Sequence, residues 1–226
     1  MNTLAFDTSG SFLSIGLKTE TGFYEENRSA ELRHSEHLLP AVERLMNTAG
    51  IEFSNLDLIV CSKGPGSFTG LRIGMSTAKG LAAANGTPIV SVSSLDILAR
   101  GLSFFNGAVV PVIDARKKRF YSAIYYCGEK QTDYLDISTP DLAAMLKDYS
   151  RVLFTGPDCG IFLHNLQSAY YNFSVEQYRP VQGLSLVMIE HGESIFSEKG
   201  ADREDSGPLY IRLSDAEIIH NEKKSE

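Results

Sequence analysis

The chain has 226 residues, enough for one large domain or two small ones, and its 43% hydrophobic and 22% charged residues are ordinary for a globular protein. A formal net charge of −7 excludes an overall basic, nucleic-acid-binding character, and the longest apolar runs, such as 109–113, are too short to cross a membrane. Three scattered cysteines without a CxxC pair argue against a disulfide or zinc framework. No basic and apolar leader follows Met1, so we expect a cytoplasmic protein.

The first half of the chain predicts a three-stranded meander followed by alternating helices and strands. Short apolar runs bounded by Gly and Ser predict strands, and apolar residues three or four apart predict helices. The expected strands cover residues 4–6, 12–17, 22–24, 56–60 and 88–92. The expected helices cover residues 35–49, with Ser35 as cap, 71–84 and 94–102. The predicted order is therefore β-β-β-α-β-α-β-α.

The second half predicts the same order again. Its expected strands cover residues 108–113, 119–126, 131–137, 151–154 and 173–175. Its expected helices begin at residue 139 and cover 159–168 and 184–196. We therefore expect an α/β chain of two similar units with mixed sheets, 1–105 and 106–226, the second ending in a solvated charged tail at 217–226.

The glycine-rich loop at residues 64–70 is the strongest local signal. A strand-to-helix turn with little side-chain bulk can present backbone N–H groups to an anion, here at Gly64 and Gly66. Leu71 stands where a Walker loop needs lysine, and Thr69 fills the third glycine position of a dinucleotide fingerprint. The alternative is a tight turn in which glycine and proline only set the backbone.

A carboxylate and two hydroxyls, Asp7-Thr8-Ser9, follow the first predicted strand. Duplicated domains of the actin and hexokinase type place such a group beside nucleotide phosphates and Mg²⁺. One hypothesis is therefore an actin-like phosphotransferase or ATPase that uses Asp7 and the loop at 64–70. A capping aspartate in a turn is the structural alternative. A two-metal nuclease needs more clustered carboxylates than this half supplies.

The predicted helix after the loop has unusually many small side chains. Gly70, Gly74, Ala78 and Ala82 recur every four residues and share one face, and a second light stripe contains Ile73, Thr77, Gly80 and Ala84. Glycine inside a helix costs about 1 kcal/mol relative to alanine, which a close neighbour can offset. Small residues on two sides favour contact with a second helix, and packing within the domain alone is the alternative.

Other polar residues carry weaker signals. His34 and His37 lie three apart at a helix start without a third histidine nearby, so we expect no metal site. The basic run at 116–119 lies in a predicted hairpin turn, where it is either a solvated tip or a contact for RNA phosphates.

Several of these segments together resemble the bacterial TsaB (YeaZ) family. They are Phe6-Asp7-Thr8-Ser9, His34-Ser35-Glu36, the undecapeptide at 64–74, Ser93-Ser94-Leu95, Asp114-Ala115-Arg116 and Tyr210-Ile211-Arg212. The resemblance implies a duplicated actin-like (RNase H-like) fold. It also implies a non-catalytic partner of a TsaD-type transferase that, with a TsaE-type ATPase, modifies adenosine 37 of tRNA with threonylcarbamoyl.

The resemblance separates this chain from the catalytic subunit. TsaD-like proteins carry a His-x-x-x-His metal pair where this chain has residues 92–97 without histidine. No catalytic residue, metal or cofactor is therefore expected in the isolated chain, and ATP or ADP with Mg²⁺ is expected only in the complex. The alternative nucleotide or anion site would use Asp7, Thr8, Ser9, Gly64 and Gly66.

The family pairs through its first two helices, with TsaD or with a second TsaB, which implies a heterodimer and, alone, a homodimer. Contact with tRNA is then indirect, and no membrane is involved. The pairing residues expected here are small or apolar positions of the two helices. They are Leu39, Met46, Gly70, Leu71, Gly74, Met75, Ala78 and Ala82.

Overall fold

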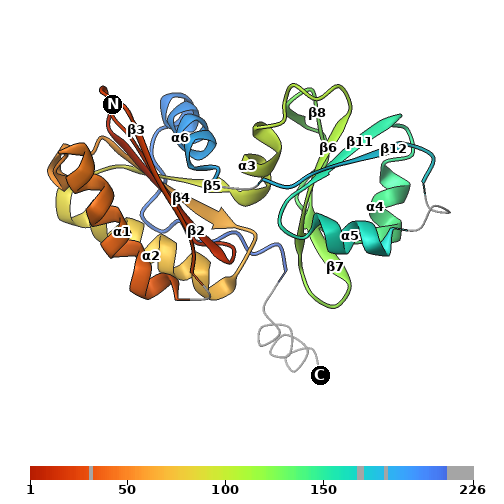
Figure 1. The fold of residues 1–226 in the computed structure, drawn as a ribbon, viewed down its shortest axis with the longest axis horizontal. Helices are drawn as coiled ribbons and strands as arrows, with labels where there is room; N and C mark the ends of the chain where they lie inside the picture. Colours follow the sequence, from red (N-terminus) through yellow and green to blue (C-terminus); the bar gives the residue numbers. More distant parts are fainter. Residues whose placement is uncertain (31–32, 167–170, 181–182, 213–226) are drawn as a thin grey trace.

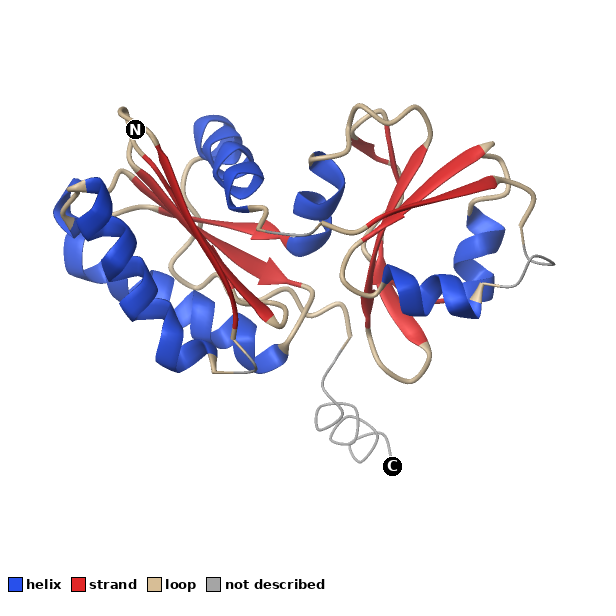
Figure 2. Cartoon of the chain, in the orientation of Figure 1, coloured by secondary structure: helices blue, strands red, loops and turns tan. Residues whose placement is uncertain are grey.

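The computed structural model describes residues 1–30, 33–166, 171–180 and 183–212. Two lobes, each built on one sheet, lie side by side along the long axis of the molecule (Figures 1 and 2). Two of the predicted segments, the end of the helix at 159–168 and the tail at 217–226, lie wholly or partly outside these residues.

The first lobe is formed by most of the first half of the chain. Its elements are β1 (Thr3–Asp7), β2 (Phe12–Lys18), β3 (Phe23–Ser29), α1 (His34–Ala49), the 3-10 turn η1 (Phe53–Asn55), β4 (Leu58–Gly64), α2 (Phe68–Asn85) and β5 (Ile89–Ser93). The sheet order is β3-β2-β1-β4-β5, with β1 antiparallel to β2 and parallel to β4. Helix α1 begins one residue before the predicted cap Ser35, and no side chain caps it.

The second lobe follows the connecting helix α3 (Ser94–Arg100). Its elements are β6 (Ala108–Asp114), β7 (Arg119–Ser122), β8 (Tyr125–Tyr126), β9 (Glu129–Lys130), β10 (Leu135–Ser138), α4 (Thr139–Met145), β11 (Arg151–Thr155), α5 (Cys159–Asn165) and β12 (Ser174–Tyr178), with α6 (Ser185–Lys199) after it. The sheet path is β10-β7-β6-β11-β12, and β8 pairs with β6 and β9 beside it.

The two sheet paths repeat one topology. In each, the first strand of the lobe lies at the centre, two antiparallel strands lie on one side of it, and two parallel strands lie on the other. The predicted α/β fold with two repeated units and mixed sheets is confirmed. The duplication is established by the strand order and strand directions that the two sheets share, and not by residue identity between the halves.

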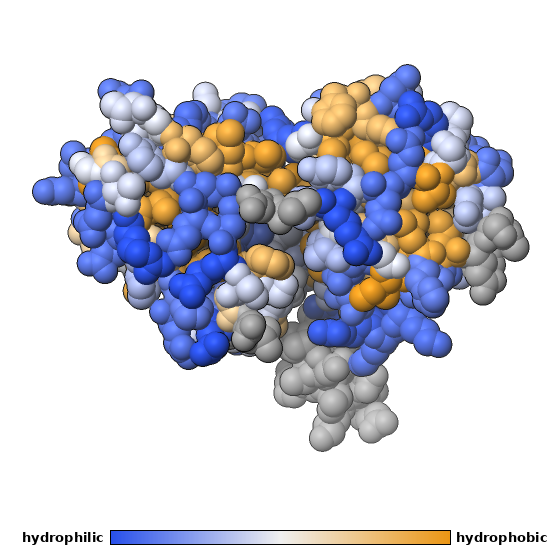
Figure 3. All heavy atoms as spheres, in the orientation of Figure 1, coloured by the Kyte–Doolittle hydropathy of each residue, from blue (hydrophilic) through white to orange (hydrophobic). Residues whose placement is uncertain are grey.

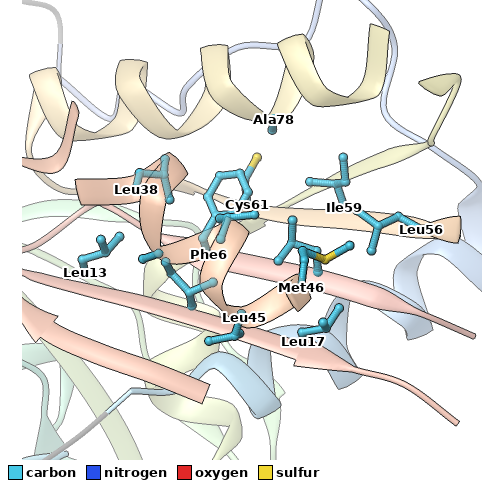
Figure 4. Packing of buried hydrophobic residues seen from close by; sticks show 14 of the residues in the cluster. Phe6, Leu13, Leu17, Leu38, Leu45, Met46, Leu56, Ile59, Cys61 and Ala78 are labelled. Carbon is cyan, nitrogen blue, oxygen red and sulfur yellow. The ribbon is translucent and has the colours of Figure 1, made fainter. Parts of the chain in front are cut away.

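Each central strand of the first sheet is buried on both faces. Phe6 and Cys61 point towards α1 and α2 (Figure 4), and their neighbours Ala5 and Val60 point to the opposite side. Such continuous apolar strands are typical of parallel pairing under helices on both faces. Burial raises the pKa of the Cys61 thiol to about 12, so it is a neutral packing group at physiological pH.

Two helices cross the division predicted at residue 105. Helix α6, which the prediction places in the second unit, packs against β1, β2 and β5 of the first lobe, where Met188 and Ile189 are buried. Helix α3, from the first unit, packs against β6 and also touches α6. The apolar face that α1 and α2 leave open needs a cover, and α6 supplies it. The strands of the two sheets lie on either side of residue 105 in the sequence, and α6 covers the first sheet.

The predicted strand at 119–126 is divided into β7 and β8. Both pieces pair with β6 in one continuous register, and the interruption at residue 123 falls opposite Pro111. Proline has no backbone N–H to give to the ladder. Ser122 Oγ donates instead to the Pro111 carbonyl at 2.8 Å.

Candidate functional site

The glycine-rich loop lies directly against the end of β1. Ser67 N donates to the Ser9 carbonyl at 2.7 Å, and Thr8 Oγ1 donates to the Gly70 carbonyl at 2.7 Å. The Ser67 hydroxyl also caps α2 by accepting from Gly70 N at 3.3 Å. The structure therefore brings together the predicted residues Thr8, Ser9 and Gly66, with the loop backbone closed onto β1.

The glycine spacing follows from this close approach. A Cβ on Gly66 would lie 2.4 Å from the Ser9 carbonyl oxygen, one on Gly70 would lie 2.0 Å from the Thr8 carbonyl oxygen, and one on Gly74 would lie 2.4 Å from Thr8 Oγ1. Any larger residue would push α2 away from β1. The stripe of small residues is thus used by the chain's own fold.

The same contacts fill the place where the alternative hypothesis puts phosphates. Asp7 Oδ1 accepts from Ser9 N at 2.7 Å, and Ser9 Oγ accepts from Ser94 Oγ at 3.2 Å. Gly64 has a φ of +96°, and a Cβ there would lie 2.7 Å from Leu71 Cδ1. Asp7 therefore supports a turn, and this arrangement favours the tight-turn interpretation over a phosphate-binding loop.

The eight predicted pairing residues of α1 and α2 differ in burial: some are covered by the chain and others are exposed. Six of them are covered by the chain itself: Met46, Gly70, Leu71, Gly74, Met75 and Ala78. Leu39 is 49% exposed, and Ala82 is partly buried. These six pack within the lobe in the single chain, whereas Leu39 and Ala82 are at least partly exposed, and the pairing role of all eight stays a prediction.

Part of the second stripe of small residues on α2 faces outwards, whereas Ile73 of that stripe packs against the core. Gly80 and Ala84 are exposed, Thr77 is half-buried, and a Cβ on Gly80 would meet nothing within 4 Å. Helices α1 and α2 pack side by side on one face of the first sheet (Figure 1), and Leu39 on α1 is also exposed. We call Leu39, Thr77, Gly80 and Ala84 the outer face. It is smooth enough for close approach of another helix.

A strap from the C-terminal part of the chain joins the two lobes. It comprises residues 203–212 and runs from the first lobe towards the second (Figure 1). On the first lobe, Leu209 N donates to the Lys63 carbonyl at 2.7 Å, and the Tyr210 ring lies 5.3 Å from that of Phe68. On the second lobe, Arg212 binds Asp136 through Nε at 2.7 Å.

Asp136 is the second-lobe anchor of this strap. It accepts from Arg119 at 2.8 Å as well as from Arg212. Burial acts to raise the pKa of Asp136, but hydrogen bonds from Arg212 and Arg119 outweigh burial and hold the pKa below its ordinary value. Sequence reasoning missed this role, and the only signal for it was the Tyr210-Ile211-Arg212 segment.

The strap borders a cleft between the lobes with a volume of about 280 Å³. The glycine-rich loop and Phe68 form one wall, and the strap residue Tyr210 lies along it. The turn between β6 and β7, with Arg116 and Lys117, forms the other. Arg116, Lys117 and Lys118 have φ of +63°, +54° and +60°, so this turn holds three cations in the left-handed region. Its tip is at the lower edge of the second lobe in Figure 1, where Figure 3 shows strongly hydrophilic residues.

A second polar contact joins the lobes at α3. Asp96 accepts from Tyr125 at 2.5 Å and from Tyr134 at 2.7 Å, and the His191 ring of α6 lies 3.9 Å from it. Burial acts to raise the pKa of Asp96, but contacts with His191, Tyr125 and Tyr134 lower it overall. Burial and the Asp96 charge raise the pKa values of both tyrosines. Asp96 is therefore an ionised hub between α3, α6 and the second lobe.

Comparison with known proteins gives several relatives described as TsaB, one of them over nearly the whole chain. The family model described as "TsaD: tRNA N6-adenosine threonylcarbamoyltransferase" matches residues 27–152. The tRNA threonylcarbamoyladenosine biosynthesis protein TsaB of Bacillus subtilis is 32% identical over 225 residues, which cover 96% of each chain. The chain belongs to the TsaB family. The Escherichia coli protein of the same description is 35% identical over 131 residues, or 57% of each chain.

Solved structures agree with the TsaB assignment. A Pseudomonas aeruginosa structure titled as similar to peptidase YEAZ matches with a TM-score of 0.78 and 26% identity, covering 93% of this chain and 99% of that one. A second, titled "YeaZ from Pseudomonas aeruginosa", has a TM-score of 0.79 at 23% identity with the same coverage, and shows the shared fold.

Residues 92–97 contain no histidine. These residues end β5 and begin α3, where the Ser93 hydroxyl accepts from Leu95 N at 3.2 Å. Within the described residues, no group of three or more His, Cys, Asp and Glu side chains could hold a metal ion. His34 instead is buried, with Nε2 2.8 Å from the Gly10 carbonyl. No described helix is long and apolar enough to span a membrane.

Proposed function

We propose that this chain is the TsaB subunit of a bacterial machinery that installs threonylcarbamoyl on adenosine 37 of tRNA. In this role it binds a TsaD-type transferase, which performs the chemistry, and works with a TsaE-type ATPase in the cytoplasm. The full-length similarity to Bacillus subtilis TsaB carries the proposal. Any ATP or ADP and Mg²⁺ belong to the complex.

The outer face of α1 and α2 supports a pairing role. Thr77, Gly80 and Ala84 give the outer side of α2 only small side chains, and Leu39 on α1 is an exposed apolar residue. Burying one side chain of leucine size contributes about 1.5–3 kcal/mol. Because the same patch on two copies is self-complementary, it also serves a homodimer when the transferase subunit is missing.

The experiment replaces Gly80→Arg and, separately, Ala84→Arg. Both positions are exposed, so the variants should fold, and a large charged side chain should block a neighbouring helix. We expect at least tenfold weaker binding to the TsaD-type subunit, loss of the homodimer, and loss of threonylcarbamoyladenosine from tRNA in cells that carry only the variant. Calorimetry, light scattering and nucleoside mass spectrometry measure these three effects.

Ala144→Arg on α4 is the matched control, because Ala144 is exposed on the second lobe. It should leave binding and modification unchanged. Full transferase binding by both α2 variants would contradict the pairing surface. Normal tRNA modification in cells that lack this chain would contradict the function itself.

A further inference from the structure

We propose that two copies of this chain pair with α1 of one copy lying over α2 of the other, because these two helices carry opposite charge. This inference rests on the proposed function, in which the same helices form the pairing surface. It adds the arrangement of the four helices and the residues that select it. They are Glu36 and Glu43 on α1, and Arg72 and Lys79 on α2.

The first observation is the negative charge of α1. Glu36 and Glu43 are exposed, and both lie on the side of the helix opposite to its buried residues. Within the described residues, neither carboxylate has a hydrogen bond or an ion pair. The other formal charge on α1 is Arg44, which is matched by Glu26 of β3 at 2.6 Å. The exposed side of α1 is therefore negative.

The second observation is the positive charge of α2, a helix without Asp or Glu. Arg72 is exposed, and it contacts the Phe68 ring at 3.9 Å and donates to Tyr210 Oη at 3.2 Å. Lys79 donates to the Glu204 carbonyl at 2.8 Å. These three partner groups are uncharged, so the contacts hold the two side chains in place without cancelling their charge. An acidic helix can approach without displacing them.

The third observation is that α1 and α2 start at the same level. His34 Nε2, at the start of α1, lies 2.8 Å from the Gly10 carbonyl oxygen, and Ser67 N, at the start of α2, donates to the Ser9 carbonyl at 2.7 Å. The helices lead to β4 and β5, which are parallel to each other and to β1. Helices α1 and α2, side by side in Figure 1, therefore run in the same direction.

The charged residues consequently match in spacing. Glu36 is the third residue of α1 and Arg72 the fifth of α2, and Glu43 and Lys79 each follow seven residues later. A two-fold axis along the helices places α1 over α2 of the second copy at the same level, so each carboxylate approaches a cation. An axis across the helices places α1 over α1, where like charges repel. Charge therefore selects the first arrangement.

The test measures self-association of the full chain by analytical ultracentrifugation at several salt concentrations. Glu36→Gln with Glu43→Gln removes two charges at exposed positions, so the fold should be kept. We expect the dissociation constant of the homodimer to rise about three- to tenfold at low salt, and the difference to fade at high salt. With α1 over α1, the same change would tighten the dimer. A tighter dimer, an unchanged dimer or no wild-type dimer would overturn the proposal.

A charge exchange within one chain tests the arrangement from the side of α2. Ser76 is exposed on α2, one turn after Arg72, so Ser76→Glu should weaken the dimer. Adding Glu36→Lys and Glu43→Lys to that variant should restore it, because α1 then becomes positive and faces the new carboxylate. Absence of this rescue would overturn the proposal.

The matched control is Glu129→Gln with Glu190→Gln, which removes two charges at exposed positions outside α1 and α2. It should dimerise as the wild type does, and a loss equal to that of the α1 variant would overturn the proposal. Calorimetry of the wild-type chain with the TsaD-type subunit separates the two inferences. Binding there keeps the proposed function standing whatever the homodimer shows, whereas absence of binding counts against that function.

Discussion

The glycines of α2 and of the loop before it have different structural roles, which depend on the residues that lie next to each of them. Gly66, Gly70 and Gly74 let α2 lie on the end of β1, where a Cβ would come within 2.4 Å of Thr8 or Ser9. Gly80, on the same helix, has open space beside it. Glycine is therefore required at the first three positions, and at the fourth it only weakens the helix of the isolated chain.

Paired substitutions should separate these tasks. Gly70→Ala should lower the free energy of unfolding by about 1–3 kcal/mol, because its Cβ would meet the Thr8 carbonyl. Gly80→Ala should raise the free energy of unfolding by about 0.5–1 kcal/mol, since alanine favours the helix. Urea denaturation of the full chain measures both. Equal effects of the same sign would contradict the assignment of the two stripes.

At the scale of elements, the middle of helix α6 lies in close contact with the first sheet. A Cβ on Gly192 would lie 2.5 Å from Val60 Cγ2. Met188 and Ile189 are buried on the same sheet face, so displacement of α6 exposes apolar area. The helix can cover the sheet only when its middle residue is small.

We therefore expect Gly192→Leu to lower the free energy of unfolding by about 1–3 kcal/mol or more. The matched substitution Ser197→Leu lies on an exposed position of α6 and should change it by less than about 0.5 kcal/mol. Hydrogen exchange of α6 should increase in the first variant only. Protection of α6 that is unaffected by Gly192→Leu would show that this contact does not hold the helix.

The sequence predicts most elements but not which faces meet. Periodicity and turn residues locate α2 and its two light stripes, yet both stripes are small, and the position of Thr8, far away in sequence, decides which one is inside. The break at residue 123 could be anticipated only by pairing it with Pro111. The strap depends on tertiary contacts that local sequence patterns do not reveal. The same is true of the packing of α6, a helix of the second half, on the sheet of the first half.

At the scale of the whole molecule, two sets of polar contacts among the described residues link the lobes, beside the apolar packing of α3 against the second lobe. The Asp96 contacts with Tyr125 and Tyr134 link α3 to the second lobe, and the strap links Phe68 in the first lobe to Asp136 in the second. Both connections are polar and both contain an ionised carboxylate with a lowered pKa. We therefore expect these two polar contacts to weaken in acid.

The strap should lose stability in acid with a defined sign. Because the folded-state pKa of Asp136 is below its usual value of about 3.9, its contribution is fully present above that value and is lost as pH falls through the lower folded-state pKa. Asp136→Asn should thus be destabilising near pH 7, and the difference from wild type should shrink below about pH 4. Denaturation curves across this range measure it.

Glu176→Gln is the control for this titration, because Glu176 pairs with Arg151 in an exposed ion pair of ordinary strength. It should change stability little at any pH in the range. A wild-type advantage over Asp136→Asn that stays constant down to pH 2 would contradict the role of the carboxylate.

The late position of α6 in the chain has a consequence for synthesis. While the ribosome makes residues 1–183, the sheet face that carries Ala5, Val60 and Val90 has no cover. The second lobe emerges in the meantime, so this apolar face of the first lobe stays uncovered and prone to self-association until α6 is made. Nascent chains stalled before α6 should therefore recruit chaperones, and release of α6 should end that recruitment.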